Sequence, residues 1–100
     1  MTYQKYILDE NHNHIPVDLM TWGRWFGDIK NRRVAEDKIG KVKVSTVFMG
    51  TDHNFSDDGP PLLYETMIFG GKRNDEQERY STWDEAIAGH KRIVKEITNE

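Results

Sequence analysis

The segments VKVSTVFM (Val42–Met49) and LLYETMIF (Leu62–Phe69) set the architecture of this chain. Both are rich in β-branched and aromatic residues, which favour β-strands. Successive side chains of a strand point to opposite faces, and both faces of the first segment are fairly apolar. The first segment is therefore predicted to be a central strand that is covered on both sides. One face of the first strand would carry Val42, Val44, Thr46 and Phe48, and one face of the second would carry Leu62, Tyr64, Thr66 and Ile68.

A polar loop of twelve residues, Gly50–Pro61, joins these two strands. A simple hairpin needs only about two to five linking residues. Long loops on a rigid scaffold often carry function, and this one holds His53 with the carboxylates of Asp52, Asp57 and Asp58. We therefore expect the working surface here, with binding candidates Asp52, His53, Asn54 and Phe55.

The same loop groups could serve other chemistry. Carboxylates and imidazoles bind divalent metals and carry out acid–base catalysis. A calcium loop, however, needs acidic groups at alternate positions, a central glycine and a late glutamate, and this loop lacks that spacing. The alternative is an ordered turn, in which Asp and Asn side chains accept hydrogen bonds from nearby amides. The sequence predicts no specific metal site and no bound cofactor.

The N-terminal part contains weaker signals. A short strand is expected at Tyr3–Leu8, followed by a polar turn at Asp9–His14, whose histidines either share a metal or lie in a solvated loop. Pro16 and Asp18 indicate a helix start with Asp18 as N-cap. The helix would present Leu19, Trp22, Trp25 and Phe26 on one face and end near Gly27. Asn31–Glu36 would form a further strand, with a turn at 37–40.

The C-terminal third contains the clearest helix signal. After a polar link, Gly70–Glu78, the segment Ser81–Asp84 resembles a capping box. Apolar positions then recur at helical spacing, which predicts an amphipathic helix lying on the sheet. The stripe consists of Trp83, Ala86, Ile87, His90, Ile93, Val94 and Ile97. The predicted fold is α+β, with the order β-α-β-β-β-α: an antiparallel meander of three to four strands with two helices.

Residues outside the loop are also candidates. His90 lies on the apolar stripe, so it is either a core histidine with a polar partner or part of a pocket with Tyr64 or Glu65. Arg24, Lys30, Arg32 and Arg33 form a small basic cluster that could bind phosphate or an acidic surface. The alternative is that these side chains are exposed to solvent and have no binding role. The three tryptophans could stack bases, although core packing explains them as well.

Composition sets the broad class. The chain has 100 residues, which predicts a single domain over 1–100, with 36% hydrophobic residues and 31% charged residues. It has no cysteine, which excludes disulfides and fits a reducing cytoplasm. No signal-peptide pattern and no apolar run of membrane-spanning length occurs. The formal net charge of −3 gives no strong nucleic-acid signal. Homo-oligomerisation is left open.

Several segments along the chain form a characteristic set: Tyr6–His12 (YILDENH), Trp22–Phe26 (WGRWF), Arg32–Ala35 (RRVA), Val44–Gly50 (VSTVFMG), Asp52–Phe55 (DHNF), Gly59–Gly71 (GPPLLYETMIFGG) and Arg79–Trp83 (RYSTW). Together they resemble a family of small proteins encoded in bacteriophage, prophage and bacterial genomes, and the resemblance covers nearly the whole chain. It implies a one-domain cytoplasmic protein of an infected or lysogenic bacterial host cell, and it implies no particular activity.

Three functions follow as hypotheses. The first is a phage accessory protein that acts as a binding module on a host or phage macromolecule, foremost a protein, and counteracts a host defence. The second is binding of a small anionic ligand such as a nucleotide, with Arg24, Arg32 or Arg33 on its phosphate. The third is a metal-dependent hydrolase built from Asp52, His53 and Asp57, with His90 or Glu65 assisting. The absence of an established catalytic pattern favours the first hypothesis over an enzyme.

Overall fold

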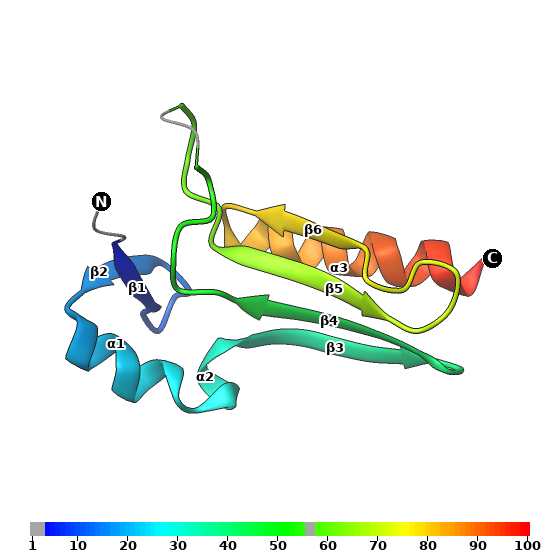
Figure 1. Ribbon diagram of the computed structural model, residues 1–100, viewed down its shortest axis with the longest axis horizontal. Coiled ribbons are helices and arrows are strands. Elements are labelled where there is room, and N and C mark those ends of the chain that lie inside the picture. Colours follow the sequence, from blue (N-terminus) through cyan, green and yellow to red (C-terminus); the bar gives the residue numbers. More distant parts are fainter. Residues whose placement is uncertain (1–3, 56–57) are drawn as a thin grey trace.

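The computed structural model describes residues 4–55 and 58–100 and has an α+β architecture (Figure 1). Its main sheet has four antiparallel strands in the order β3-β4-β5-β6. These are β3 (Arg33–Ile39), β4 (Val42–Phe48), β5 (Tyr64–Phe69) and β6 (Gln77–Tyr80). The predicted α+β class and the antiparallel meander are confirmed. The two segments that defined the prediction are neighbours in the sheet, with Thr46 opposite Thr66.

Helix α3 (Trp83–Thr98) packs on one face of this sheet (Figure 1). Its N-cap is Thr82, whose hydroxyl accepts a hydrogen bond from the Glu85 amide and donates one to the Glu85 carboxylate. The capping box therefore lies one residue later than the sequence indicated. The core between helix and sheet contains Phe48, Leu63, Tyr64 and Ala86 in one cluster and Val44, Ile68, Ile93 and Ile97 in a second.

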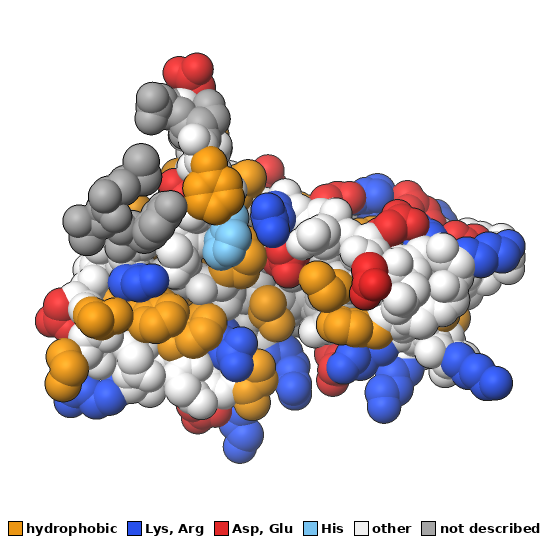
Figure 2. Space-filling model, in the orientation of Figure 1, with side chains coloured by type: hydrophobic (Ala, Val, Ile, Leu, Met, Phe, Trp, Pro, Cys, Tyr) orange, Lys and Arg blue, Asp and Glu red, His pale blue; other side chains and the backbone are white. Residues whose placement is uncertain are grey.

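The second face of the sheet differs from the prediction that β4 is covered on both sides. Val47 and Met67 on this face are only half-buried, and Phe69 is 40% exposed. Lys43 crosses the ring of Phe69, with Nζ 4.8 Å from the centroid. Figure 2 shows hydrophobic side chains among charged ones on the face of the molecule seen there. The apolar character of this second face is therefore shielded by long charged side chains, because their stems can lie along apolar surface.

The N-terminal part forms a hairpin where one strand was expected. Strands β1 (Lys5–Leu8) and β2 (His14–Val17) pair with each other, and helices α1 (Leu19–Phe26) and α2 (Ile29–Arg32) follow. Asp18 is the N-cap of α1, as predicted, and accepts a hydrogen bond from the Thr21 amide at 2.7 Å. Pro16, however, lies in β2 and not at the helix start. Both strands of a two-stranded sheet are edge strands, and an edge strand tolerates proline, which has no amide hydrogen to donate.

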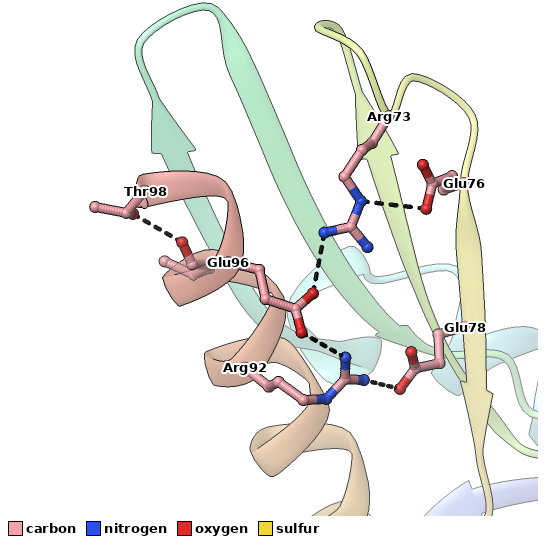
Figure 3. A network of polar contacts seen from close by, with 7 residues as sticks. Arg73, Glu76, Glu78, Arg92, Glu96 and Thr98 are labelled. Atoms are coloured by element: carbon pink, nitrogen blue, oxygen red, sulfur yellow. Dashed lines mark hydrogen bonds and ion pairs between the residues drawn. The ribbon is translucent and has the colours of Figure 1, made fainter. Parts of the chain in front are cut away.

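The segment Gly70–Glu78 is a turn followed by the start of β6, and not simply a polar link. Its charged side chains pair with α3 (Figure 3). Arg73 bridges Glu76 at 3.2 Å and Glu96 at 3.0 Å, and Arg92 joins Glu96 to Glu78. The strand was missed because its stabilising partners are charges on a remote helix, so its own sequence shows no apolar alternation. The predicted order β-α-β-β-β-α is thus incomplete, since β2, α2 and β6 are additional.

In the part of the chain that the structure describes, no helix combines the length and the apolar character that crossing a membrane requires.

Candidate functional site

The loop 50–61 begins at a tightly packed glycine. Gly50 has φ +70°, and a Cβ placed there would lie 2.5 Å from Nε1 of Trp22. Its carbonyl accepts a hydrogen bond from the Tyr6 amide at 2.8 Å, so strand β1 borders the loop. Only glycine adopts this conformation in so little space. The start of the loop is therefore fixed against the N-terminal hairpin.

The carboxylate of Asp52 closes the base of the loop. Its Oδ1 accepts hydrogen bonds from the amides of Asn54, at 2.7 Å, and Leu62, at 2.9 Å. The His53 amide donates to the Leu62 carbonyl at 2.9 Å, and Nδ1 of His53 lies 2.8 Å from the Thr51 carbonyl. Asp52 and His53 therefore hold the loop together, as the ordered-turn interpretation describes.

Beyond this base the loop stands away from the sheet (Figure 1). The side-chain Nδ2 of Asn54 donates to the carbonyls of Asp58, at 2.9 Å, and Pro60, at 3.0 Å, which ties the two arms of the loop together. The side chain of Phe55 is 74% exposed, and its ring centroid lies 6.2 Å from that of His53. Asp57 lies outside the described residues. The loop thus exposes a large aromatic side chain next to a base that is held by hydrogen bonds.

His90 is part of a buried polar chain. Its Nε2 lies 2.7 Å from Oδ2 of Asp37, and its Nδ1 lies 2.7 Å from Oγ1 of Thr46. Oγ1 of Thr46 is 2.5 Å from that of Thr66, which accepts a hydrogen bond from the Tyr80 hydroxyl at 3.0 Å. The order of acid, imidazole and hydroxyl resembles a hydrolase triad, but Thr46 is 0% exposed. The arrangement is therefore a satisfied core, because no substrate reaches that hydroxyl.

Glu65, which the sequence suggested as a partner of His90 in a pocket, lies on the opposite face of the sheet from His90. It pairs with Arg79, with Oε2 3.0 Å from Nε. His53 is held in the loop, so these three residues occupy separate environments and form no common site. Within residues 4–55 and 58–100, no group of three or more acidic or histidine side chains is arranged to hold a metal ion. The geometry thus gives the hydrolase hypothesis no support.

The predicted basic cluster is dispersed. Arg24 is exposed on the last turn of α1. The guanidinium of Arg32 lies over the ring of Phe26, 4.5 Å from its centroid, and Phe26 stacks on Trp22 at 4.5 Å. Arg33, at the start of β3, lines a hollow instead. Lys30 lines the same hollow, so two members of the predicted cluster meet there.

That hollow has a volume of about 280 Å³, against about 40 Å³ for a small cavity between β6 and α3. Its wall includes the hairpin turn, the ends of α1 and α2, and the first residue of α3. The sequence indicated Lys30 and Arg33 as members of one basic cluster and the tryptophans as a separate candidate for base stacking. Their proximity could not be recognised, because the wall is assembled from segments far apart in the chain. The residues most relevant to ligand chemistry are His12, Trp25, Lys30, Arg33 and Trp83.

Comparison with known proteins gives no match: no family model, curated protein or solved structure matches this chain.

Proposed function

We propose that this protein is a binding module that presents the loop 50–61 to a partner protein. The observation that carries the proposal is the combination of a fixed base at Asp52 with the exposed side chain of Phe55. A loop held by its own hydrogen bonds loses less conformational freedom on binding than a flexible one. The proposed surface consists of the described part of this loop and the neighbouring strand β1.

Phe55 would supply the apolar anchor of this interface. A few aromatic or arginine side chains usually provide most of the binding energy, each in a pocket of the partner. The partner is accordingly expected to offer an apolar pocket for Phe55. The net charge of −3 favours a partner with a basic surface around that pocket, because long-range attraction raises the rate of encounter.

The resemblance to phage-encoded proteins supports a biological context for this proposal. In that context the partner is a host or phage protein in an infected bacterium, and binding counteracts a host defence. The proposed mode of action is occupancy of the partner's surface without catalysis.

Affinity capture from a bacterial lysate tests the proposal. The tagged protein is compared with Phe55→Ala and with Phe69→Ala, a matched control that removes a 40% exposed aromatic side chain from the sheet face. We expect a specific partner that is retained by wild type and Phe69→Ala and lost by Phe55→Ala, provided that all three proteins are folded by circular dichroism. Capture of the same proteins by wild type and Phe55→Ala would overturn the proposal.

A further inference from the structure

The hollow beside the N-terminal hairpin has the features of a ligand site that is separate from the loop. Its volume of about 280 Å³ is close to the lower end, about 300 Å³, of small-molecule sites. The groups that line it include two indole rings, an imidazole, two cations, two carboxylates and the side-chain amide of Asn31. A mixed wall of this kind indicates a ligand with several distinct parts, because each polar group needs a complementary one.

The aromatic part of the wall is rigid. The imidazole of His12 stacks on Trp83, with centroids 3.6 Å apart and planes at 4°. Trp25 meets Phe48 edge-on at 5.7 Å and 89°, which fixes its ring. Trp25 and Trp83 are half-buried, whereas His12 is exposed. Planar rings held by such contacts are suited to stacking on a planar ligand, as the aromatic side chains of single-stranded nucleic-acid sites stack on bases.

The turn that carries His12 has an unusual backbone. His12 has φ +63°, in the left-handed region that side chains rarely adopt. The carboxylate of Asp9 stabilises this turn by accepting hydrogen bonds from the amides of Asn11, at 2.8 Å, and Asn13, at 2.9 Å. Strained conformations that the surroundings enforce are frequent at ligand sites. Here the enforced conformation places the imidazole on Trp83, at the wall of the hollow.

The two cations of the hollow have no internal partner. Among the described residues, neither Lys30 nor Arg33 forms an ion pair, whereas Arg73, Arg79 and Arg92 each bind a carboxylate. Both lie at the α2–β3 junction, so their positive charges are close in the chain. Guanidinium and ammonium groups in such a position bind phosphate through charge-assisted hydrogen bonds.

The carboxylates lie on a different element. Asp9 and Glu10 belong to the hairpin turn, and they too line the hollow. They disfavour a ligand that is anionic throughout, and they favour one with amino or imino donors at that end. Asn31 donates its side-chain amide hydrogen to the Trp25 carbonyl at 2.8 Å, so its carbonyl oxygen is oriented and can accept a further hydrogen bond.

From these groups we infer that the hollow binds a mononucleotide whose base carries an exocyclic amino group. The base stacks on the indole and imidazole rings, its amino group faces the carboxylates of the hairpin turn, and its phosphate meets Lys30 and Arg33. A volume of about 280 Å³ is of the order that a single small ligand such as a mononucleotide fills. This is a free small molecule, and the inference does not depend on the loop.

Calorimetric titration of the full chain with AMP tests this inference, with UMP, adenosine and inorganic phosphate as comparison ligands. We expect saturable binding of AMP. Adenosine alone and phosphate alone should each bind at least about tenfold more weakly than AMP, because adenosine lacks the charged contacts and phosphate lacks the stacking contacts. UMP should bind more weakly than AMP, since uracil has no amino group for Asp9 and Glu10.

Two variants locate the site. The double variant Lys30→Gln/Arg33→Gln should weaken AMP binding about tenfold or more, while Lys41→Gln/Lys91→Gln, which removes the same charge from exposed positions elsewhere, should not. His12→Asn keeps a residue that tolerates the left-handed conformation but removes the ring, and it should weaken AMP without affecting phosphate.

Three outcomes would overturn the inference: no saturable AMP binding at millimolar concentration, AMP binding no tighter than phosphate, or equal binding by the two double variants. Phe55→Ala should bind AMP like wild type. A failure of the loop proposal and a failure of this inference are therefore distinguishable.

Discussion

Nε2 of His90 lies 2.7 Å from Oδ2 of Asp37, which joins the middle of α3 to the outer strand β3. One set of donor directions satisfies every group of the buried chain. In this set the Tyr80 hydroxyl donates to Thr66, the Thr66 hydroxyl to Thr46, the Thr46 hydroxyl to Nδ1 of His90, and Nε2–H of His90 to Asp37. The chain joins all four strands of the main sheet and helix α3, so it fixes their relative positions.

We expect His90→Ala to lower the free energy of unfolding by about 3 kcal/mol, because it leaves a cavity and removes the partner of Thr46. Asp37→Asn keeps an acceptor for Nε2–H at a side chain that is 55% exposed, and should cost less than about 1 kcal/mol. Urea denaturation measures both values. Lys91→Ala, on the exposed side of the same helix, is the control. A loss no larger for His90→Ala than for Lys91→Ala would show that the chain contributes nothing.

Two glycines in helices should respond in opposite ways to alanine. At Gly89 an added Cβ would lie 2.3 Å from Cε1 of Tyr80, whereas at Gly23 it meets nothing within 4 Å. Alanine is favoured over glycine in a helix by about 1 kcal/mol. We therefore expect Gly23→Ala to stabilise the protein by up to about 1 kcal/mol and Gly89→Ala to destabilise it by about 2 kcal/mol through overpacking. Thermal denaturation of both variants measures the difference, and the same sign for both would contradict this packing.

The free energy of unfolding should fall in alkaline solution because the buried hydroxyl of Tyr64 resists ionisation. Burial, followed by the nearby charge of Asp84, raises the pKa of Tyr64 from 10.0 to about 12. The unfolded chain loses this proton first, so the stabilising contribution is complete below the unfolded pKa and is lost as pH rises from about 10 to about 12. Tyr64→Phe should therefore lose less stability across this range in urea titrations. Identical pH profiles for variant and wild type would disprove the assignment.

Asp52 should be important for the order of the loop. Asp52→Ala leaves the amides of Asn54 and Leu62 without their acceptor, which should cost about 1–3 kcal/mol. Asp52→Asn retains an acceptor oxygen and should cost less. Hydrogen exchange at the Leu62 amide reports the change directly, with faster exchange expected in Asp52→Ala. Unchanged exchange there would mean that the carboxylate does not hold the loop base.

The central sheet was predictable from sequence because its signal is local. Alternation in Val42–Met49 and Leu62–Phe69 indicated the faces of both strands correctly, and the apolar stripe placed His90 against the sheet. The partners of His90 were not predictable, since Asp37 and Thr46 are 53 and 44 positions away along the chain. Tyr64 and Glu65, the partners expected for His90, are not the ones it binds.

The hairpin and strand β6 were missed for a different reason. Pro16 resembles a helix start in sequence, yet it lies in a two-stranded sheet that has no inner strand. Strand β6 is polar because its residues face charges on α3 and solvent. In both cases the local signal gives little information, because the stabilising contacts come from the rest of the fold.

Site-specific photo-crosslinking tests the binding surface most directly. A photoreactive aromatic residue is placed at position 55 in one protein and at position 69 in another, and each is irradiated in bacterial lysate. We predict a covalent adduct with the same partner protein from position 55 and not from position 69. An adduct from position 69 with none from position 55 would contradict the assignment of the loop as the contact surface.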